Sequence, residues 1–172
     1  MKTNDFFKIY GSSERQDALL KLSDEHYVLF FGFGKDNPDD ETGYKWRKDY
    51  DHKPTVEELR TDIEELIDKD TDERTMTGFV WNDKPVHLST ESRFNFKAAY
   101  DLAVQKQGAT LPVKFKLGED AEKKPVYHVF ENMEEFTDFY TKGMAYVNQV
   151  LNDGWLKKDA VDYDALLEGG EE

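Results

Sequence analysis

The segment Gly78-Phe-Val-Trp-Asn-Asp-Lys-Pro-Val-His-Leu-Ser-Thr90 predicts a tight β-hairpin that leads directly into a helix. Phe79 and Trp81 alternate on one side of the first strand, and Val86 and Leu88 answer them after the turn. Asn82-Asp83 supplies that turn, because side chains of this kind tolerate the positive φ it needs. Ser89 and Thr90 follow the return strand, and either hydroxyl can cap the first turn of a helix.

The helix expected after this hairpin covers about residues 91–107 and ends at Gly108, a residue that favours the left-handed conformation found after helices. Its apolar residues recur at helical spacing and are expected to face inward. These residues are Phe94, Ala98 and Leu102, with Tyr100 as a further candidate.

The same order of elements recurs downstream. A second hairpin is expected over residues 113–130, followed by a helix that Asn132 caps and that runs to about Asn152, with Gly154 as its end. Both return strands open with Lys-Pro-Val. The repetition predicts an α+β fold, in which two β-hairpin–helix units form a small antiparallel sheet with helices packed on one face.

A further helix is expected from Thr55 to about Lys69. Pro54 prevents an upstream helix from continuing, and Thr55 with Glu58 three residues later matches a capping box. The residues after Glu58 place apolar side chains on one face and acidic side chains on the others, which is typical of a helix lying on a core.

The chain is expected to divide into three parts. Residues 1–43 form an N-terminal extension with one strand at 27–33, residues 44–158 form the α+β domain, and residues 159–172 form a short helix and a frayed tail. In this interpretation the extension and the tail serve as assembly arms.

Composition narrows the classes of partner. The 172 residues include 37 acidic and 23 basic side chains, for a net charge of −14, and no cysteine. An acidic chain is a poor partner for nucleic acid, since phosphate binding requires clustered Lys and Arg. The longest uncharged apolar run, Tyr27–Gly34, is far shorter than the roughly 20 residues of a membrane-spanning helix. We therefore expect neither nucleic acid nor a membrane as a partner.

Residues that could carry chemistry do not form a reactive set in the sequence. His87 and His128 stand at similar places in the two return strands and could approach each other, but no ligand lies beside them at metal spacing. Asp68, Asp70 and Asp72 copy the start of a calcium loop, which then lacks its glycine and its last carboxylate. We expect no catalytic residue, no metal site and no cofactor.

Aromatic residues near the N-terminus are the remaining signal. The segment 44–50 alternates aromatic and charged residues, as an exposed or edge strand would, and it is the one locally basic stretch. Ordinary packing against the next helix is the alternative interpretation. The functional interpretation is that aromatic and apolar residues of this segment and of residues 6–10 anchor another protein chain. There are seven such candidates. They are Phe6, Phe7, Ile9, Tyr10, Tyr44, Trp46 and Tyr50.

Residues 44–162 resemble a domain of unknown function that recurs in tail-associated proteins of gut bacteriophages and prophages, crAss-like phages included. The resemblance rests on Tyr-Lys-Trp-Arg-Lys-Asp-Tyr-Asp-His-Lys-Pro-Thr (44–55), on Gly-Phe-Val-Trp (78–81), on Val-His-Leu-Ser-Thr-Glu-Ser-Arg-Phe-Asn-Phe (86–96) and on Leu-Pro-Val-Lys-Phe-Lys-Leu-Gly (111–118). Members often carry Gln where Arg93 stands, so this position departs from the pattern.

The resemblance implies a non-enzymatic component of the phage virion, at the tail or neck. Such a protein would be present in several copies and would contact other virion proteins. The resemblance assigns no functional residues to this chain. Two rival interpretations stay open. One is an acidic, phage-encoded inhibitor that mimics DNA and binds a host protein, and the other is a small enzyme that uses His87 and His128.

Overall fold

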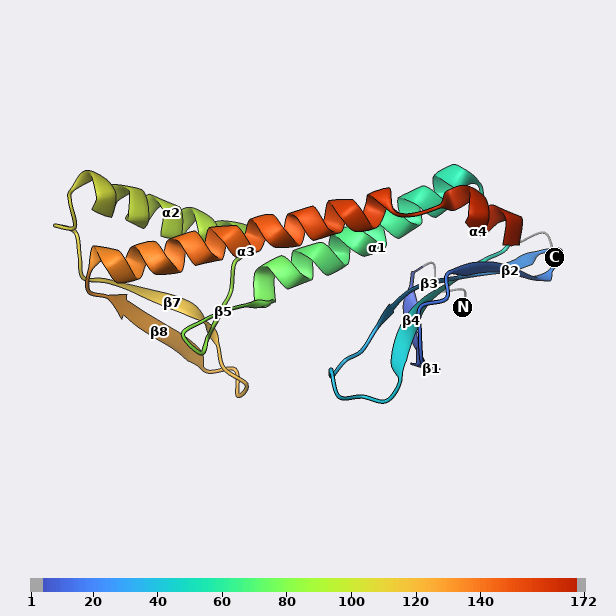
Figure 1. The fold of residues 1–172 in the computed structure, drawn as a ribbon, viewed down its shortest axis with the longest axis horizontal. Coiled ribbons are helices and arrows are strands. Elements are labelled where there is room, and N and C mark those ends of the chain that lie inside the picture. Colours follow the sequence, from blue (N-terminus) through green and yellow to red (C-terminus); the bar gives the residue numbers. More distant parts are fainter. Residues whose placement is uncertain (1–4, 170–172) are drawn as a thin grey trace. The chain divides into compact units, whose positions relative to one another are not determined.

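A computed structural model describes residues 5–169, which form eight strands and four helices (Figure 1). The predicted α+β class is confirmed. The elements are β1 (Phe7–Ser12), β2 (Ala18–Ser23), β3 (His26–Gly34), β4 (Gly43–Tyr50), α1 (Val56–Thr77), β5 (Phe79–Trp81), β6 (Lys84–Val86), α2 (Thr90–Gln105), β7 (Val113–Glu119), β8 (Pro125–Phe130), α3 (Met133–Asp159) and α4 (Tyr163–Gly169). They belong to two compact units, one made of residues up to 66 and from 158 on, the other of residues 67–157.

The first unit contains a four-stranded antiparallel sheet with the strand order β1-β4-β3-β2. Residues 1–43 therefore carry three strands, and the expectation of one strand there is wrong. Neither β1 nor β2 was expected, because the apolar residues in this part of the sequence have little around them with which to build a core. Each is defined by its neighbour, because Ile9 pairs with Lys45 and Leu19 pairs with Leu29. The pairing of β1 with β4 is non-local and is not visible in a local pattern, whereas β2 and β3 are consecutive strands of a hairpin.

The second unit contains the two predicted hairpins. Asn82 and Asp83 have φ values of 48° and 60°, which a two-residue turn of this hand requires. Each hairpin is a two-stranded sheet, and β6 lies beside β7, where His87 N–H donates to the Leu117 carbonyl at 2.7 Å. Helices α2 and α3 lie on one face of the β7–β8 hairpin, as expected (Figure 1).

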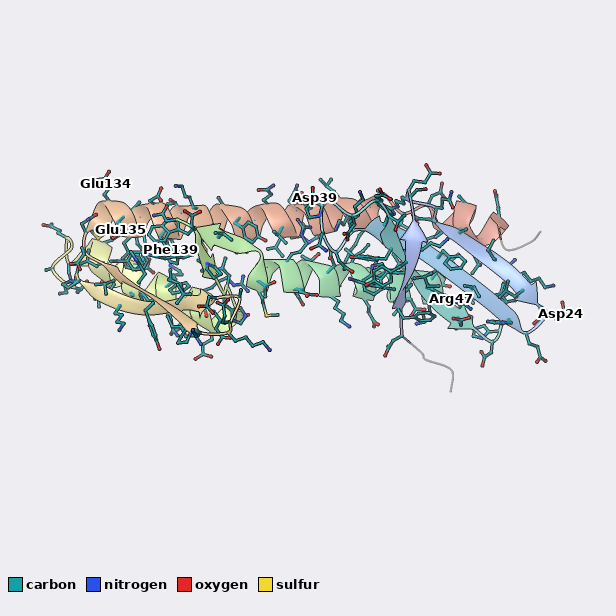
Figure 2. All side chains as sticks on the ribbon, turned by 90° about the horizontal axis from the view of Figure 1, so that it is seen from below. Asp24, Asp39, Arg47, Glu134, Glu135 and Phe139 are labelled. Carbon is teal, nitrogen blue, oxygen red and sulfur yellow. The ribbon has the colours of Figure 1, made fainter. Side chains whose placement is uncertain are left out.

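An aromatic cluster forms the core of the second unit. The Phe130 ring from β8 lies 4.6 Å from Phe136 and 4.9 Å from Phe139, both on α3, and Trp81 from β5 lies 5.3 Å from Phe139. Figure 2 labels Phe139 on its helix. All four side chains are at most 2% exposed. Truncating a buried Phe in such a cluster typically costs about 3–5 kcal/mol.

The predicted helix caps are confirmed. Glu58 N–H donates to Thr55 Oγ1 at 3.2 Å while Thr55 N–H donates to the Glu58 carboxylate at 2.8 Å, which is a capping box. Ser89, rather than Thr90, caps α2 by accepting from Ser92 N–H. Asn132 Oδ1 accepts from the N–H three residues later and caps α3.

Two helices run further than predicted. Helix α1 continues beyond Lys69 because its next turns pack on α3 without large apolar residues: Thr71 is buried against Gly154, and Asp70 pairs with Lys157 at 2.9 Å. Gly154 consequently does not end α3. It lies inside the helix, where the absence of a side chain leaves room for Thr71.

The inward face of α2 is also different from the prediction. Phe96 and Ala103 are buried, whereas Phe94 is 71% exposed and Leu102 46% exposed. The aromatic contacts with α3 decide the rotation of the helix, because Tyr100 stacks on the ring of Tyr140 at 4.3 Å and Phe96 meets Phe139 at 5.1 Å. A spacing of four residues marks a helix face, but it does not say which of two apolar faces is covered.

None of the helices within residues 5–169 is long and apolar enough to cross a membrane. The predicted short C-terminal helix is present as α4, next to β2 in the first unit. The frayed tail predicted beyond it falls on residues 170–172, which lie outside the described part of the chain.

Replacing Gly154 tests the close packing of α1 and α3. A Cβ atom at this position would lie 2.6 Å from the buried Thr71 Oγ1. We expect Gly154→Ala to lower the free energy of unfolding by about 1–3 kcal/mol, measured by urea denaturation. Adding Thr71→Ala should recover part of this loss. Gly143→Ala is the matched control, because its Cβ would make an ordinary 3.5 Å contact with Phe79. Equal stabilities of the two glycine variants would contradict the packing.

Candidate functional site

The four-stranded sheet of the first unit has two faces with different surroundings. Side chains alternate between the faces along each strand, and paired residues share a face. One face, here called the helix-side face, is joined to α1 because Lys48 and Tyr50 both contact Asp62. Five of the seven predicted contact residues lie on it by register or by contact with Lys48. They are Phe6, Tyr10, Tyr44, Trp46 and Tyr50.

Tyr50 is a structural residue of this face. It is 8% exposed, and its hydroxyl donates to Asp62 at 2.7 Å, while the Lys48 ammonium lies 2.6 Å from the other oxygen of the same carboxylate. Burial, together with the hydrogen bond to Asp62, raises the pKa of the Tyr50 hydroxyl far above its ordinary value. One carboxylate thus fastens β4 to α1, and Tyr50 is not free to anchor a partner.

Tyr44 and Trp46 are held by glycines on the neighbouring strand. Tyr44 pairs with Gly34, where a Cβ would lie 2.6 Å from the ring, and Trp46 lies over Gly32, which has a φ of +68°. The Lys8 ammonium lies 3.8 Å from the Tyr44 ring centroid. The glycines of β3 therefore accommodate two aromatic rings, and both rings are only partly exposed.

Tyr10 is the most accessible of the predicted contact residues, at 62% exposure. Its hydroxyl donates to Asp36 at 2.7 Å, and Lys8 binds the other oxygen of that carboxylate at 2.6 Å. The hydrogen bonds from Lys8 and Tyr10 lower the pKa of Asp36. Tyr10 can contact a partner with its ring while its hydroxyl stays bound to the loop after β3.

The opposite face of the sheet, here called the open face, carries Phe7 and Ile9, the other two predicted residues. Register places apolar side chains from three strands on it and basic side chains from β4 between them. Its members are Phe7, Ile9, Ala18, Leu20, His26, Val28, Phe30, Lys45, Arg47 and Asp49. Figure 2 labels Arg47 on its strand. Phe7 is 39% and Leu20 42% exposed, and Leu22 at the end of β2 is 57% exposed.

Charged groups on the open face contact one another and its aromatic rings. Arg47 donates two hydrogen bonds to Asp49, at 2.6 and 3.0 Å, and His26 lies 2.8 Å from the same carboxylate. The hydrogen bond from Arg47 is the main cause of a lowered pKa at Asp49. Lys45 lies 4.1 Å from the Phe30 ring centroid. Asp49 is therefore neutralised, and the face as a whole is apolar and basic on a chain that is strongly acidic.

Sequence reasoning missed most of this face. The signal was present in Ala18-Leu-Leu-Lys-Leu-Ser23, where Leu20 and Leu22 alternate with Lys21, but no core partner was apparent for the segment. Lys45 and Arg47 are part of the basic stretch noted in the sequence. That stretch and Phe7 come together only through the pairing of β1 with β4.

A cleft of about 580 Å³ lies in the second unit, between the end of α1, β6, the start of α2 and β7. Two pairs of its polar side chains are bound to a neighbour: Lys116 pairs with Glu119 at 2.7 Å, and Ser92 with Ser89 at 3.0 Å. His87 lines the cleft with an exposed ring. The other lining residues are Thr77, Pro85, Val86, Glu91, Asn95, Leu117 and Gly118.

The structure does not bring His87 and His128 together. His128 lies against the core, with Trp81 5.0 Å away, and is not among the residues of the cleft. Its Nδ1 lies 2.7 Å from the Lys84 ammonium, which can only donate, so Nδ1 accepts and Nε2–H donates to Glu135 at 2.7 Å. This chain of contacts joins β6, β8 and α3.

Within residues 5–169, no three or more His, Cys, Asp or Glu side chains are arranged to hold a metal ion. Comparisons with protein-family models, with curated proteins and with solved structures give no match. The resemblance to a phage tail-associated domain therefore stays a prediction.

A Tyr50→Phe variant tests the contact between sheet and helix. Below pH 10 we expect it to be less stable by about 1 kcal/mol, because it lacks the hydrogen bond to Asp62. Above pH 10 the unfolded tyrosine loses its proton while folded Tyr50, with its raised pKa, keeps it, so stability falls as pH rises. The Tyr50→Phe variant has no hydroxyl to titrate and does not lose this stability. The difference in the free energy of unfolding between the original protein and the variant should therefore narrow between pH 10 and 11. Urea unfolding at each pH measures the stability of both proteins. Tyr127→Phe is the control, because Tyr127 is 52% exposed. A stability difference that stays the same from below pH 10 to pH 11 would contradict the role given to Tyr50.

Proposed function

We propose that this protein is a non-enzymatic structural component of a bacteriophage virion, located at the tail or neck and acting through contacts with other virion proteins. It would be made in the bacterial host, be incorporated in several copies, and need no cofactor. Two lines of support are independent of each other: the resemblance of residues 44–162 to a tail-associated domain, and the open face of the first unit.

The open face is the observation that carries the proposal. An antiparallel sheet with one covered face normally presents polar residues on the other. Here Phe7 is 39% and Leu20 42% exposed, and Ile9 and Phe30 are partly exposed on the same face, whereas Val28 on it is buried. Exposed apolar side chains on a sheet face are characteristic of a protein interface, and Arg among aromatic residues is typical of interface centres.

Charge indicates the kind of partner. Lys45, Arg47 and His26 lie among the apolar residues, and Asp49 is the only acid within residues 5–169 that strand pairing places on this face. The partner we propose is therefore a neighbouring virion protein that presents apolar side chains flanked by carboxylates. Burial of Leu20 and Phe7 at the contact would also favour binding, by roughly 25 cal/mol per Å² of apolar area removed from water.

The two rivals receive less support. A DNA mimic needs unpaired carboxylates in a regular array, but Asp36, Asp62 and Asp138 are each bound by a lysine of this chain. An enzyme that uses both His87 and His128 would need them side by side, and they occupy different surroundings.

Incorporation into particles tests the proposal. We expect mass spectrometry of gradient-purified particles to find the protein in several copies per particle. The double variant Phe7→Glu/Leu20→Glu should reduce its incorporation at least about tenfold, since carboxylates would replace apolar groups at the contact. Val80→Glu, at a residue 59% exposed in the second unit, is the matched control and should be incorporated normally.

Two results would contradict the proposal. Finding the protein only in the particle-free fraction would exclude a virion component. Normal incorporation of the double variant would remove the open face from the contact. Circular dichroism of the purified variants establishes that they are folded, so that a loss of incorporation is not a loss of structure.

A further inference from the structure

His128 binds two side chains of opposite charge in the second unit. It alternates with buried Phe130 along β8, and its side chain is only 16% exposed. Its Nδ1 lies 2.7 Å from the Lys84 ammonium of β6, and its Nε2 lies 2.7 Å from the carboxylate of Glu135, which Figure 2 labels on α3. One imidazole thus connects the β5–β6 hairpin to the β7–β8 hairpin and to a helix.

The two contacts are compatible with only one form of the imidazole. A lysine ammonium can only donate, so Nδ1 must keep its lone pair, and Nε2 must carry the proton that is donated to Glu135. A second proton would bind to the same lone pair of Nδ1 that accepts from Lys84. Two cations would then face each other at hydrogen-bonding distance, and neither could accept from the other. Lys84 therefore cannot keep this position once Nδ1 is protonated.

The other contacts of His128 within residues 5–169 are with aromatic rings. Trp81 of β5 lies 5.0 Å away and Phe130 lies 4.7 Å away, and β7 places Phe115 opposite His128. The Asp138 carboxylate of α3 is bound to Trp81 Nε1 at 2.9 Å and to a lysine one turn later. None of these groups supplies a lone pair to a protonated Nδ1, so its charge is opposed directly by the ammonium of β6.

We propose that His128 is a pH-sensitive contact that binds Lys84 of the β5–β6 hairpin at neutral pH and releases it in mild acid. Histidine is the side chain whose charge ordinarily changes between about pH 5 and 8. The proton and Lys84 compete for one lone pair, so the stabilising effect of Lys84 is present at the upper end of this range and is lost as the pH falls. Glu135 keeps its hydrogen bond from Nε2–H in both forms, so the imidazole stays in place.

Urea denaturation at about pH 7.5 and about pH 5 is the first test. Lys84→Met should raise the equilibrium constant of unfolding about fivefold at the higher pH, because it removes one hydrogen bond. At the lower pH the same substitution should change this constant less than about twofold, since the ammonium is then already displaced. An equal effect of Lys84→Met at the two pH values would overturn the proposal.

His128→Gln is the matched background for this comparison. The Gln carbonyl can accept from Lys84 and its amide can donate to Glu135, but the side chain does not titrate. In this background Lys84→Met should have the same effect at both pH values, to within about twofold. A pH-dependent effect as large as in the original protein would assign the pH dependence to another group and refute the role of His128.

Nitrogen-15 NMR of the imidazole is the second test and needs no variant. At about pH 7.5 the spectrum should show Nδ1 of His128 without a proton and Nε2 with one, and at about pH 5 both nitrogens should carry a proton. The opposite tautomer at the higher pH, or an unprotonated Nδ1 at the lower pH, contradicts the proposal. Both tests use the isolated protein, so they are independent of the proposed virion role.

Discussion

The packing of Phe130 between Phe136 and Phe139 is the contact on which the second unit depends. These rings come from β8 and from the first turns of α3, and Trp81 and Phe115 approach the same cluster from the two hairpins. The cluster thereby determines how the hairpins meet the helices. It also determines the rotation of α2, because Phe96 and Tyr100 find their ring partners on α3. A consequence of that rotation is that Phe94 and Leu102 point outward.

A comparable constraint acts in the first unit through a single carboxylate. Asp62 binds both Lys48 and Tyr50, and this contact selects the face of the sheet that is joined to α1. Because side chains alternate along a strand, the choice of one face leaves the other without cover. The open face, with Leu20 and Arg47, follows from this choice. The open face is therefore a by-product of how the first unit is assembled.

Much of the fold could be predicted because it rests on local chemistry. The turn at Asn82-Asp83, the capping box at Thr55 and the cap at Asn132 are set by residues close in sequence, and all three are confirmed. The strand β1 could not be found in the same way, since its partner β4 lies about 30 or more residues away, and β2 was missed although it forms a hairpin with the next strand. Gly154 was misread for a related reason: its meaning depends on Thr71 of another helix.

The candidate contact residues show the same division. The aromatic residues near the N-terminus are structurally important, but Tyr44, Trp46 and Tyr50 make their contacts within the first unit. A sequence cannot tell an aromatic residue that packs on a glycine from one that awaits a partner. Phe7 and Ile9 lie on the open face, yet the other residues of that face, such as Leu20 and Phe30, become apparent only when the sheet order is known.

The central claim is that the open face contacts another virion protein. The most direct measurement is cross-linking mass spectrometry of intact particles with a carbodiimide, which joins lysine amines to nearby carboxylates and so reports the acidic neighbours of Lys45 on that face. The account predicts that Lys45 is linked to acidic, apolar segments of a different virion protein, and that these links are absent when the isolated chain is treated in the same way. If Lys45 in particles gives only the links found in the isolated chain, the open face is not the contact and the account is wrong.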